Sequence, residues 1–258
     1  MALDIDGLRL EDPPEFATRV DAAKAAADNG FRLVREIRNG WMGFASTTVP
    51  GDIFIAHTLS RQWLCSVEHS GVARELGASN FFGPGLGTVF CNTLDELYSV
   101  INRTYRLSIC LPQLPLDAFK KQTATLPRFT EAERLVVQRV GQDIFRSALM
   151  DYWNSTCPLT GITEPALLRA SHIVPWADCE TDDLRLNVYN GLLLSSLWDA
   201  AFDAGLVGFT TEGAVLVSPN LSASATMALH IESQPKLQGL SPLHEAMLKR
   251  HREKNQLR

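Results

Sequence analysis

The alternation of apolar and polar positions in the N-terminal part of the chain predicts a helix followed by strands. Alanines and charged residues recur at helical spacing over residues 17–30, which end in Asn-Gly, a typical glycine stop. Residues 31–49 then alternate apolar and polar side chains around Asn39-Gly40, the strongest short-range signal for a β-hairpin. We therefore expect one helix and one hairpin at the start of the fold.

Strand patterns continue after this hairpin, and a second helix follows them. Residues 52–59 and 62–69 are apolar runs of strand length. Thr93 and Glu96 have the spacing of a capping box, in which each side chain bonds the other residue's backbone N–H, and a helical pattern follows. These elements predict an α+β module over residues 1–120, with a recognition or regulatory role.

Three prolines between residues 111 and 129 interrupt the pattern before another long helix. This stretch has no clear period, so we expect the connection between two domains there and a second domain over residues 128–258. Thr130 and Glu133 repeat the capping-box spacing, and apolar residues recur at intervals of three and four, which predicts a helix of about 25 residues. Gly141 lies inside it and predicts that another backbone approaches closely there.

A pair of strands and a short helix are expected in the middle of the second domain. Residues 167–176 form a β-rich run stopped by a proline, and residues 184–195 form a second apolar segment broken at Asn190-Gly191. The two segments can pair through the acidic loop between them. Residues 197–204 then have the pattern of a helix that follows two serines and ends at a glycine.

The C-terminal part of the chain adds smaller elements. Residues 206–210 and 214–218 are expected to be two short strands joined by a tight turn. Ser241 as N-cap and Pro242 at the first helical position open a C-terminal helix.

One histidine and two aspartates in this region point to chemistry. Asp199 and Asp203 are four residues apart on the expected helix, so both carboxylates project from one face. His172 lies in the first strand segment, and its ordinary pKa of about 6.5 suits a general base near neutral pH. We expect the imidazole and both carboxylates to face each other around a single divalent cation.

Composition places the chain among ordinary globular proteins, with 45% apolar and 21% charged residues. The net charge of −5 argues against a protein that coats nucleic acid through bulk charge. No apolar run approaches the roughly 20 residues that span a bilayer, and the N-terminus lacks a signal-peptide pattern, so we expect a cytoplasmic protein with no membrane partner. Five scattered cysteines without a C-x-x-C pair predict free thiols.

The segment from Cys157 to Phe209, which contains "SHIVPW", "NGLLLSS" and "WDAAFD", resembles the nuclease domain of the HNH endonuclease family. The resemblance implies a C-terminal domain with the ββα-metal fold that cleaves DNA with one divalent cation, Mg²⁺ or Mn²⁺. It also implies roles for individual residues: a general base (His172), a central asparagine that ties the hairpin down (Asn190) and the metal ligands (Asp199, Asp203).

The sequence departs from the family pattern before the general base. Ser171 stands where many members have Asp or His as a ligand, and a neutral hydroxyl binds a hard cation more weakly. Each site residue also has a structural interpretation. His172 could be a structural histidine at a strand end, and Asp199 could cap its helix with Ser196 in a capping-box spacing. Asp203 opposes the helix dipole in the last turn, so a metal or a basic partner should compensate it.

Polar residues on the long helix and in the first strand are candidate DNA contacts, although a solvated face is the default interpretation of the helical ones. They are Arg139, Gln142, Arg146 and Arg169. In the N-terminal module, aromatic residues near arginines could hold DNA or a modified base, or could be core. The aromatic residues are Trp41, Phe44, Trp63, Phe81 and Phe82, and the arginines are Arg35, Arg38 and Arg61.

These patterns favour a DNA endonuclease of a restriction or phage-defence system, whose N-terminal module recognises the target. Two other functions stay open at this point. One is an effector nuclease activated by a signal, and the other is a DNA-binding regulator whose catalytic site has decayed. The sequence also leaves open whether the protein forms a homodimer.

Overall fold

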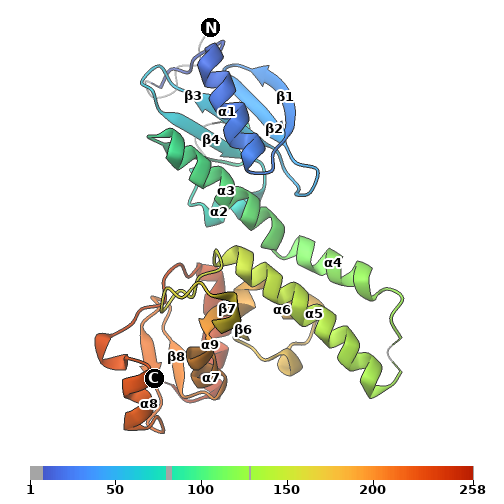
Figure 1. Cartoon of the computed structure of the whole chain (residues 1–258), viewed down its shortest axis with the longest axis vertical. Helices are drawn as coiled ribbons and strands as arrows, with labels where there is room; N and C mark the ends of the chain where they lie inside the picture. The colour runs from blue at the N-terminus through green and yellow to red at the C-terminus, as the bar shows by residue number, and fades with distance from the viewer. Residues whose placement is uncertain (1–7, 80–82, 128, 258) are drawn as a thin grey trace. The chain divides into compact units, whose positions relative to one another are not determined.

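The structure is a computed structural model that describes residues 8–79, 83–127 and 129–257, and it divides into two compact units, Met1–Ile109 and Cys110–Arg258. Both helices and strands occur in each unit (Figure 1). The predicted mixed α+β class is therefore confirmed.

The first unit is built on a five-stranded antiparallel sheet whose strands follow one another in sequence order. Asn39 and Gly40 form the two-residue loop between the first two strands, and both have positive φ (51° and 80°), as a tight hairpin turn of this kind requires. The predicted hairpin is thus confirmed. The strands are β1 (Leu33–Arg38), β2 (Trp41–Ala45), β3 (Ile53–His57), β4 (Trp63–Val67) and β5 (Gly87–Cys91).

Three helices accompany this sheet: α1 (Phe16–Asp28), α2 (Ser70–Glu75) and α3 (Leu94–Cys110). Helix α1 contacts β2 and β3, and α2 contacts β4 and β5 (Figure 1). The sequence patterns predicted α1 and α3 but neither α2 nor β5, which are short and have little periodicity.

The aromatic residues that could have formed a base-binding site in this unit are largely core. Trp41, Phe44 and Trp63 are all buried. Phe81 and Phe82 lie outside the described residues. The core interpretation of these aromatics therefore fits the structure better than the base-binding one.

The second unit begins with two helices, α4 (Gln113–Thr123) and α5 (Glu131–Tyr152), which pack against each other. Helix α4 lies in the stretch that was expected to be an irregular connection. Its prolines do not break it, because Pro112 is the N-cap and Pro115 falls in the first turn, where no N–H has an intrahelical partner. The capping box of Thr130 and Glu133 at the start of α5 is confirmed.

Gly141 of α5 corrects one prediction. A Cβ atom at this position would lie 2.3 Å from the indole ring of Trp176 and 3.2 Å from Phe119, both of them side-chain contacts. The close approach that the glycine permits is therefore made by aromatic side chains and not by another backbone.

A two-stranded hairpin and a helix follow α5, as predicted. Strands β6 (Leu168–His172) and β7 (Gly191–Ser195) are antiparallel, and α7 (Ser196–Asp203) continues directly from β7. Asn190-Gly191 is not the tip of the hairpin, because Asn190 ends a 3₁₀ turn and Gly191 is the first residue of β7. The connection between the strands holds η2 (Trp176–Asp178), α6 (Asp182–Leu186) and η3 (Val188–Asn190), and the 3₁₀ turn η1 (Pro165–Leu167) precedes β6.

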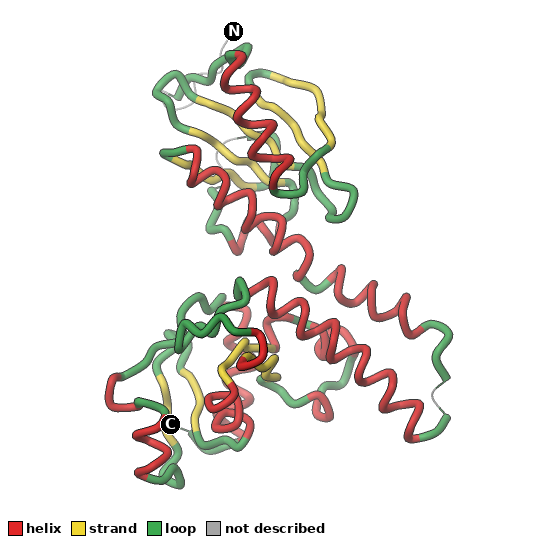
Figure 2. The backbone as a smooth tube through the Cα atoms, viewed as in Figure 1, coloured by secondary structure: helices red, strands yellow, loops and turns green. Residues whose placement is uncertain are grey.

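The remaining elements complete the second unit (Figure 2). The expected strand pair is present, and Ser241 caps a 3₁₀ turn that leads into the C-terminal helix instead of capping that helix itself. None of the helices in the described part of the chain is long and apolar enough to span a membrane. The elements are β8 (Val207–Phe209), β9 (Val215–Val217), α8 (Ala223–Ala228), η4 (Ile231–Ser233), η5 (Pro242–His244) and α9 (Glu245–Lys254).

Candidate active site

The C-terminal end of strand β6 carries the central residues of the site. Ser171 pairs with Leu192 of β7, and His172 pairs with Gly191. Successive side chains of a strand point to opposite faces, and directly paired residues share a face. A side chain at Gly191 would collide with Phe145 of α5, so the face of Gly191 and His172 is the one that α5 covers.

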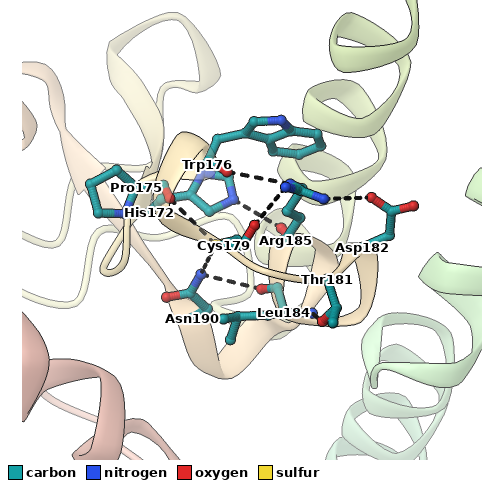
Figure 3. Close-up of polar contacts among 9 residues, drawn as sticks. All are labelled: His172, Pro175, Trp176, Cys179, Thr181, Asp182, Leu184, Arg185 and Asn190. Carbon is teal, nitrogen blue, oxygen red and sulfur yellow. Dashed lines mark hydrogen bonds and ion pairs between the residues drawn. The ribbon is translucent and has the colours of Figure 1, made fainter. Parts of the chain in front are cut away.

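The His172 ring has a defined position on that face. It stacks on Phe145, with ring centroids 3.8 Å apart, and meets Trp176 edge-on at 5.7 Å. Its Nε2 atom lies 2.9 Å from the backbone carbonyl oxygen of Arg185. Figure 3 draws this contact as a dashed line. Since a carbonyl only accepts, Nε2 carries the proton in the neutral ring, and Nδ1 keeps its lone pair.

The surroundings of His172 also set its charge. Burial lowers the pKa of the imidazole below its ordinary value, and the hydrogen bond to the Arg185 carbonyl opposes this in part. The ring is therefore neutral at pH 7. Nδ1 forms no hydrogen bond with a described residue and is not one of the fully buried, unpaired side-chain nitrogens of the described chain, so water can reach this atom.

Asn190 holds the loop that surrounds the histidine. Its side chain is fully buried, and its Oδ1 accepts a hydrogen bond of 2.8 Å from the backbone N–H of Val174. Its Nδ2 lies within hydrogen-bonding distance of the carbonyl of Leu184 and of the sulfur of Cys179 (Figure 3). The same nitrogen also lies within this distance of the carbonyl of Val174. The asparagine thus joins both ends of the connection between β6 and β7, a positioning role and not a chemical one.

We predict that Asn190→Ala lowers the free energy of unfolding by about 2–4 kcal/mol, because it leaves several buried backbone groups without a partner. Urea denaturation monitored by circular dichroism measures this. Asn220, which is exposed, provides the control: Asn220→Ala should change the free energy of unfolding by less than about 0.5 kcal/mol. Equal stability of the two variants would contradict this role of Asn190.

The other face of β6 brings a hydroxyl and two carboxyls together. Ser171 is only 2% exposed, and its hydroxyl has no partner with both the distance and the angles of a hydrogen bond. The hydroxyl is nevertheless close enough to Asp199 and Asp203 to lower the pKa of each carboxyl. The net shift of both carboxyl pKa values is nevertheless upward. Burial is the main cause for both, and for Asp203 the charge of Asp199 adds to it.

This arrangement differs from the expected one in one respect. The imidazole of His172 faces α5, whereas the side chain of Ser171 points to the two aspartates of α7. The histidine and the carboxyls therefore do not face each other directly, because consecutive strand residues project to opposite sides. They flank the same end of β6, since neighbouring Cα atoms are only about 3.8 Å apart.

The capping interpretation of Asp199 does not fit the structure. The N-cap of α7 is Ser195, and no side chain caps the helix. The hydroxyl of Ser196 instead donates to the carbonyl of Leu167, at 3.0 Å. Asp199 lies in the first turn of the helix, where the helix dipole favours a negative charge, but its carboxylate is directed to the hydroxyl of Ser171.

The candidate DNA contacts do not form one surface patch. The guanidinium of Arg146 donates to the carbonyls of Leu168 and Pro165, so it holds the segment before β6. Arg169 donates to the carbonyl of Ala166, and its charge lowers the pKa of Asp199. The remaining two candidates are exposed beside an apolar groove on α5; they are Arg139 and Gln142.

The oxygen atoms at Ser171, Asp199 and Asp203 suit a hard divalent cation. Among the described residues, no group of three or more His, Cys, Asp or Glu side chains is placed to hold a metal. Mg²⁺, however, is commonly bound through one or two carboxylates while it keeps several waters. Two carboxyls whose pKa values are raised, beside a buried hydroxyl without a full hydrogen bond, fit such a cation.

Comparison with known families identifies a domain in this part of the chain. Residues 157–210, which include β6, β7, α7 and β8, match the family model described as HNH endonuclease. The C-terminal half of the chain therefore contains an HNH endonuclease domain, and the protein is a nuclease that hydrolyses phosphodiester bonds in nucleic acid. Nucleases of this family typically use a divalent metal. No curated protein matches the chain.

Three residues around His172 were missed by sequence reasoning. Phe145, Trp176 and the carbonyl of Arg185 enclose the imidazole from α5, η2 and α6 respectively. The only signal for them in the sequence was Gly141, whose lack of a side chain makes room for Trp176.

Proposed function

We propose that this nuclease is a metal-dependent DNA endonuclease with His172 as its general base. Asp199 and Asp203, together with Ser171, would hold one Mg²⁺ or Mn²⁺ ion, and Asn190 would fix the loop between the strands. The main support is the position of His172, whose Nε2 is bonded to a backbone carbonyl while its Nδ1 is accessible. The preceding residue in the strand carries a buried hydroxyl that lies close to the carboxyls of Asp199 and Asp203.

The chemistry follows from the neutral imidazole. Nδ1 of His172 takes a proton from a water molecule, whose oxygen attacks the phosphorus as the bond to the 3′ oxygen breaks, and a solvent water molecule protonates the leaving 3′ oxygen. The products are a 5′-phosphate and a 3′-hydroxyl. A bound divalent cation supplies Lewis-acid stabilisation of the negative charge that develops on the phosphate. General base catalysis contributes about 10²- to 10⁴-fold to the rate.

We further propose that the first unit selects the DNA that is cut, as in a restriction or phage-defence enzyme. The site described above is small and gives little means of choosing a target. The first unit has a sheet and a core of its own. Its edge strand β1 is exposed along its whole length, so it can accept a partner.

A cleavage screen tests the proposed function. The full chain and a piece covering residues 110–258 are each incubated with unmodified, methylated and phage DNA in Mg²⁺ or Mn²⁺, and the ends are mapped. The piece begins at residue 110 because Phe119 of α4 is buried in the second unit. We expect 5′-phosphate ends from both, with a preference for certain DNA only in the full chain.

The other results of the screen are equally informative. Higher activity in the piece than in the full chain would indicate an effector nuclease restrained by its first unit. Intact DNA under every condition, from a folded protein, would contradict the nuclease proposal.

A further inference from the structure

Arg185 of α6 forms hydrogen bonds around His172 with both its backbone and its side chain. Its carbonyl oxygen accepts the hydrogen bond from Nε2 of His172, at 2.9 Å. Its guanidinium donates to the backbone carbonyls of Trp176 and Cys179 and to the carboxylate of Asp182 (Figure 3). All three guanidinium nitrogens therefore bond residues within the connection between β6 and β7.

The carbonyl of Arg185 needs such an anchor because its helix is very short. Helix α6 has five residues, and isolated helices far longer than this are marginal in water. Its N-terminus is capped by the hydroxyl of Thr181, which accepts from the N–H of Leu184 at 3.2 Å. The side-chain bonds of Arg185 tie the helix to the segment 176–179 and so fix the carbonyl that orients the imidazole.

The guanidinium also acts through the indole of Trp176. Its central carbon lies 5.7 Å from the centre of the Trp176 ring, a cation–π contact. The same indole meets His172 edge-on and packs against Gly141 of α5. Arg185 thus constrains His172 from two directions, through its own carbonyl and through the aromatic ring beside the imidazole.

We propose that Arg185 is a positioning residue for the general base: its guanidinium clamp on the loop 176–182 holds the carbonyl that aims Nδ1 of His172 at the attacking water. This inference rests on the proposed function of His172. The planar guanidinium matters because it reaches three acceptors at once, whereas a lysine ammonium is a point charge on a flexible stem. Arg185 itself touches neither water nor phosphate in this proposal.

Arg185→Lys provides the test, with plasmid DNA and Mn²⁺ as the probe. We expect kcat to fall about 10- to 100-fold, because a small misplacement of a catalytic group has an effect of this size, with KM within about twofold of the wild type. Arg252→Lys is the matched control. Arg252 also bonds one carbonyl, that of Phe209, and one carboxylate, that of Glu245, and its side chain is 19% exposed against 24% for Arg185.

A spectroscopic readout separates positioning from a purely structural role. In protein labelled with ¹⁵N-histidine at pH 8, the two ring nitrogens of His172 report the tautomer, and His172→Gln assigns the signals. We expect a proton on Nε2 in the wild type and in Arg252→Lys, and a mixture of tautomers in Arg185→Lys. Wild-type kcat together with a wild-type tautomer in Arg185→Lys would overturn the proposal.

Other outcomes have distinct meanings. A raised KM with a weaker salt dependence would show that Arg185 contacts DNA phosphate, which also overturns the proposal. If Arg185→Lys does not fold, Asp182→Ala removes one acceptor at a residue whose side chain is 40% exposed, and it should lower kcat several-fold in the same direction. Wild-type cleavage by His172→Ala would refute the proposed base, while the tautomer measurement would still test the clamp.

Discussion

Replacing His172 with alanine should lower the rate of DNA cleavage by about 10²- to 10⁴-fold, the range that general base catalysis contributes. The reason is that the imidazole of His172 is the proton acceptor that Phe145 and Trp176 hold in place. Added imidazole should restore part of the activity, because the variant leaves a space between these two aromatic rings that has the shape of the lost ring. Initial rates with and without imidazole measure both effects.

A second histidine provides the control for this variant. His230 is exposed and has a positive φ of 52°, which asparagine tolerates well, so His230→Asn should cleave at the wild-type rate and not respond to imidazole. Wild-type cleavage by His172→Ala would count against His172 as the base. A loss of activity that imidazole does not restore would also count against it, provided that His230→Asn behaves as expected.

The pH dependence of the wild type follows from the same environment. Burial lowers the pKa of His172, so the neutral, active ring persists below the ordinary value of about 6.5, and kcat/KM should fall only at lower pH. The effect on stability has the same sign. The neutral His172 ring makes its full contribution to stability at pH values above the pKa that histidine has in the unfolded chain. This contribution is lost as the pH falls through the lowered pKa of His172 in the folded protein.

Local patterns in the sequence predicted the elements of the site because each depends on neighbours along the chain. The four-residue spacing of Asp199 and Asp203 places both carboxyls on one face of a helix whatever the rest of the fold does. Asn39-Gly40 specifies its hairpin in the same way. The capping box at Thr130 and Glu133 similarly marks the start of α5.

Contacts between distant segments could not be predicted in this way. Arg185 is an ordinary helical arginine in the sequence, and its role depends on where α6 lies relative to His172. Phe145 follows the apolar period of α5, which says only that it is buried. The opposite directions of the Ser171 and His172 side chains do follow from the strand period of two. That α7 lies next to Ser171 and α5 next to His172 depends on tertiary packing, which the local pattern does not contain.

The paired carboxyls link the cation to the stability of the fold. Burial raises the pKa of Asp199 and Asp203, and so their protonated forms favour the folded state. That contribution is complete below the unfolded pKa of about 3.9 and is lost as the pH rises through the folded values. Ionisation of these two groups therefore costs the fold free energy, which a bound cation would offset.

Asp199→Asn should therefore have opposite effects on stability and activity. Without divalent ions at pH 7, its Tm should equal or exceed that of the wild type, because the variant removes a buried charge that repels Asp203. With Mg²⁺ or Mn²⁺, the wild type should gain stability, about 2.7 kcal/mol at a hundred times the Kd, while Asp199→Asn gains far less. Its cleavage should fall at least 100-fold, since the cation stabilises the developing charge.

Asp143→Asn is the matched control, because Asp143 is an exposed aspartate on α5 in the same unit. It should keep the wild-type Tm, the wild-type gain in Tm with metal and the wild-type rate. Thermal denaturation with and without each ion, together with cleavage rates, distinguishes the three proteins. An equal rise in Tm with metal for Asp199→Asn and the wild type would show that the cation binds elsewhere, because an amide cannot replace the charge of the lost carboxylate.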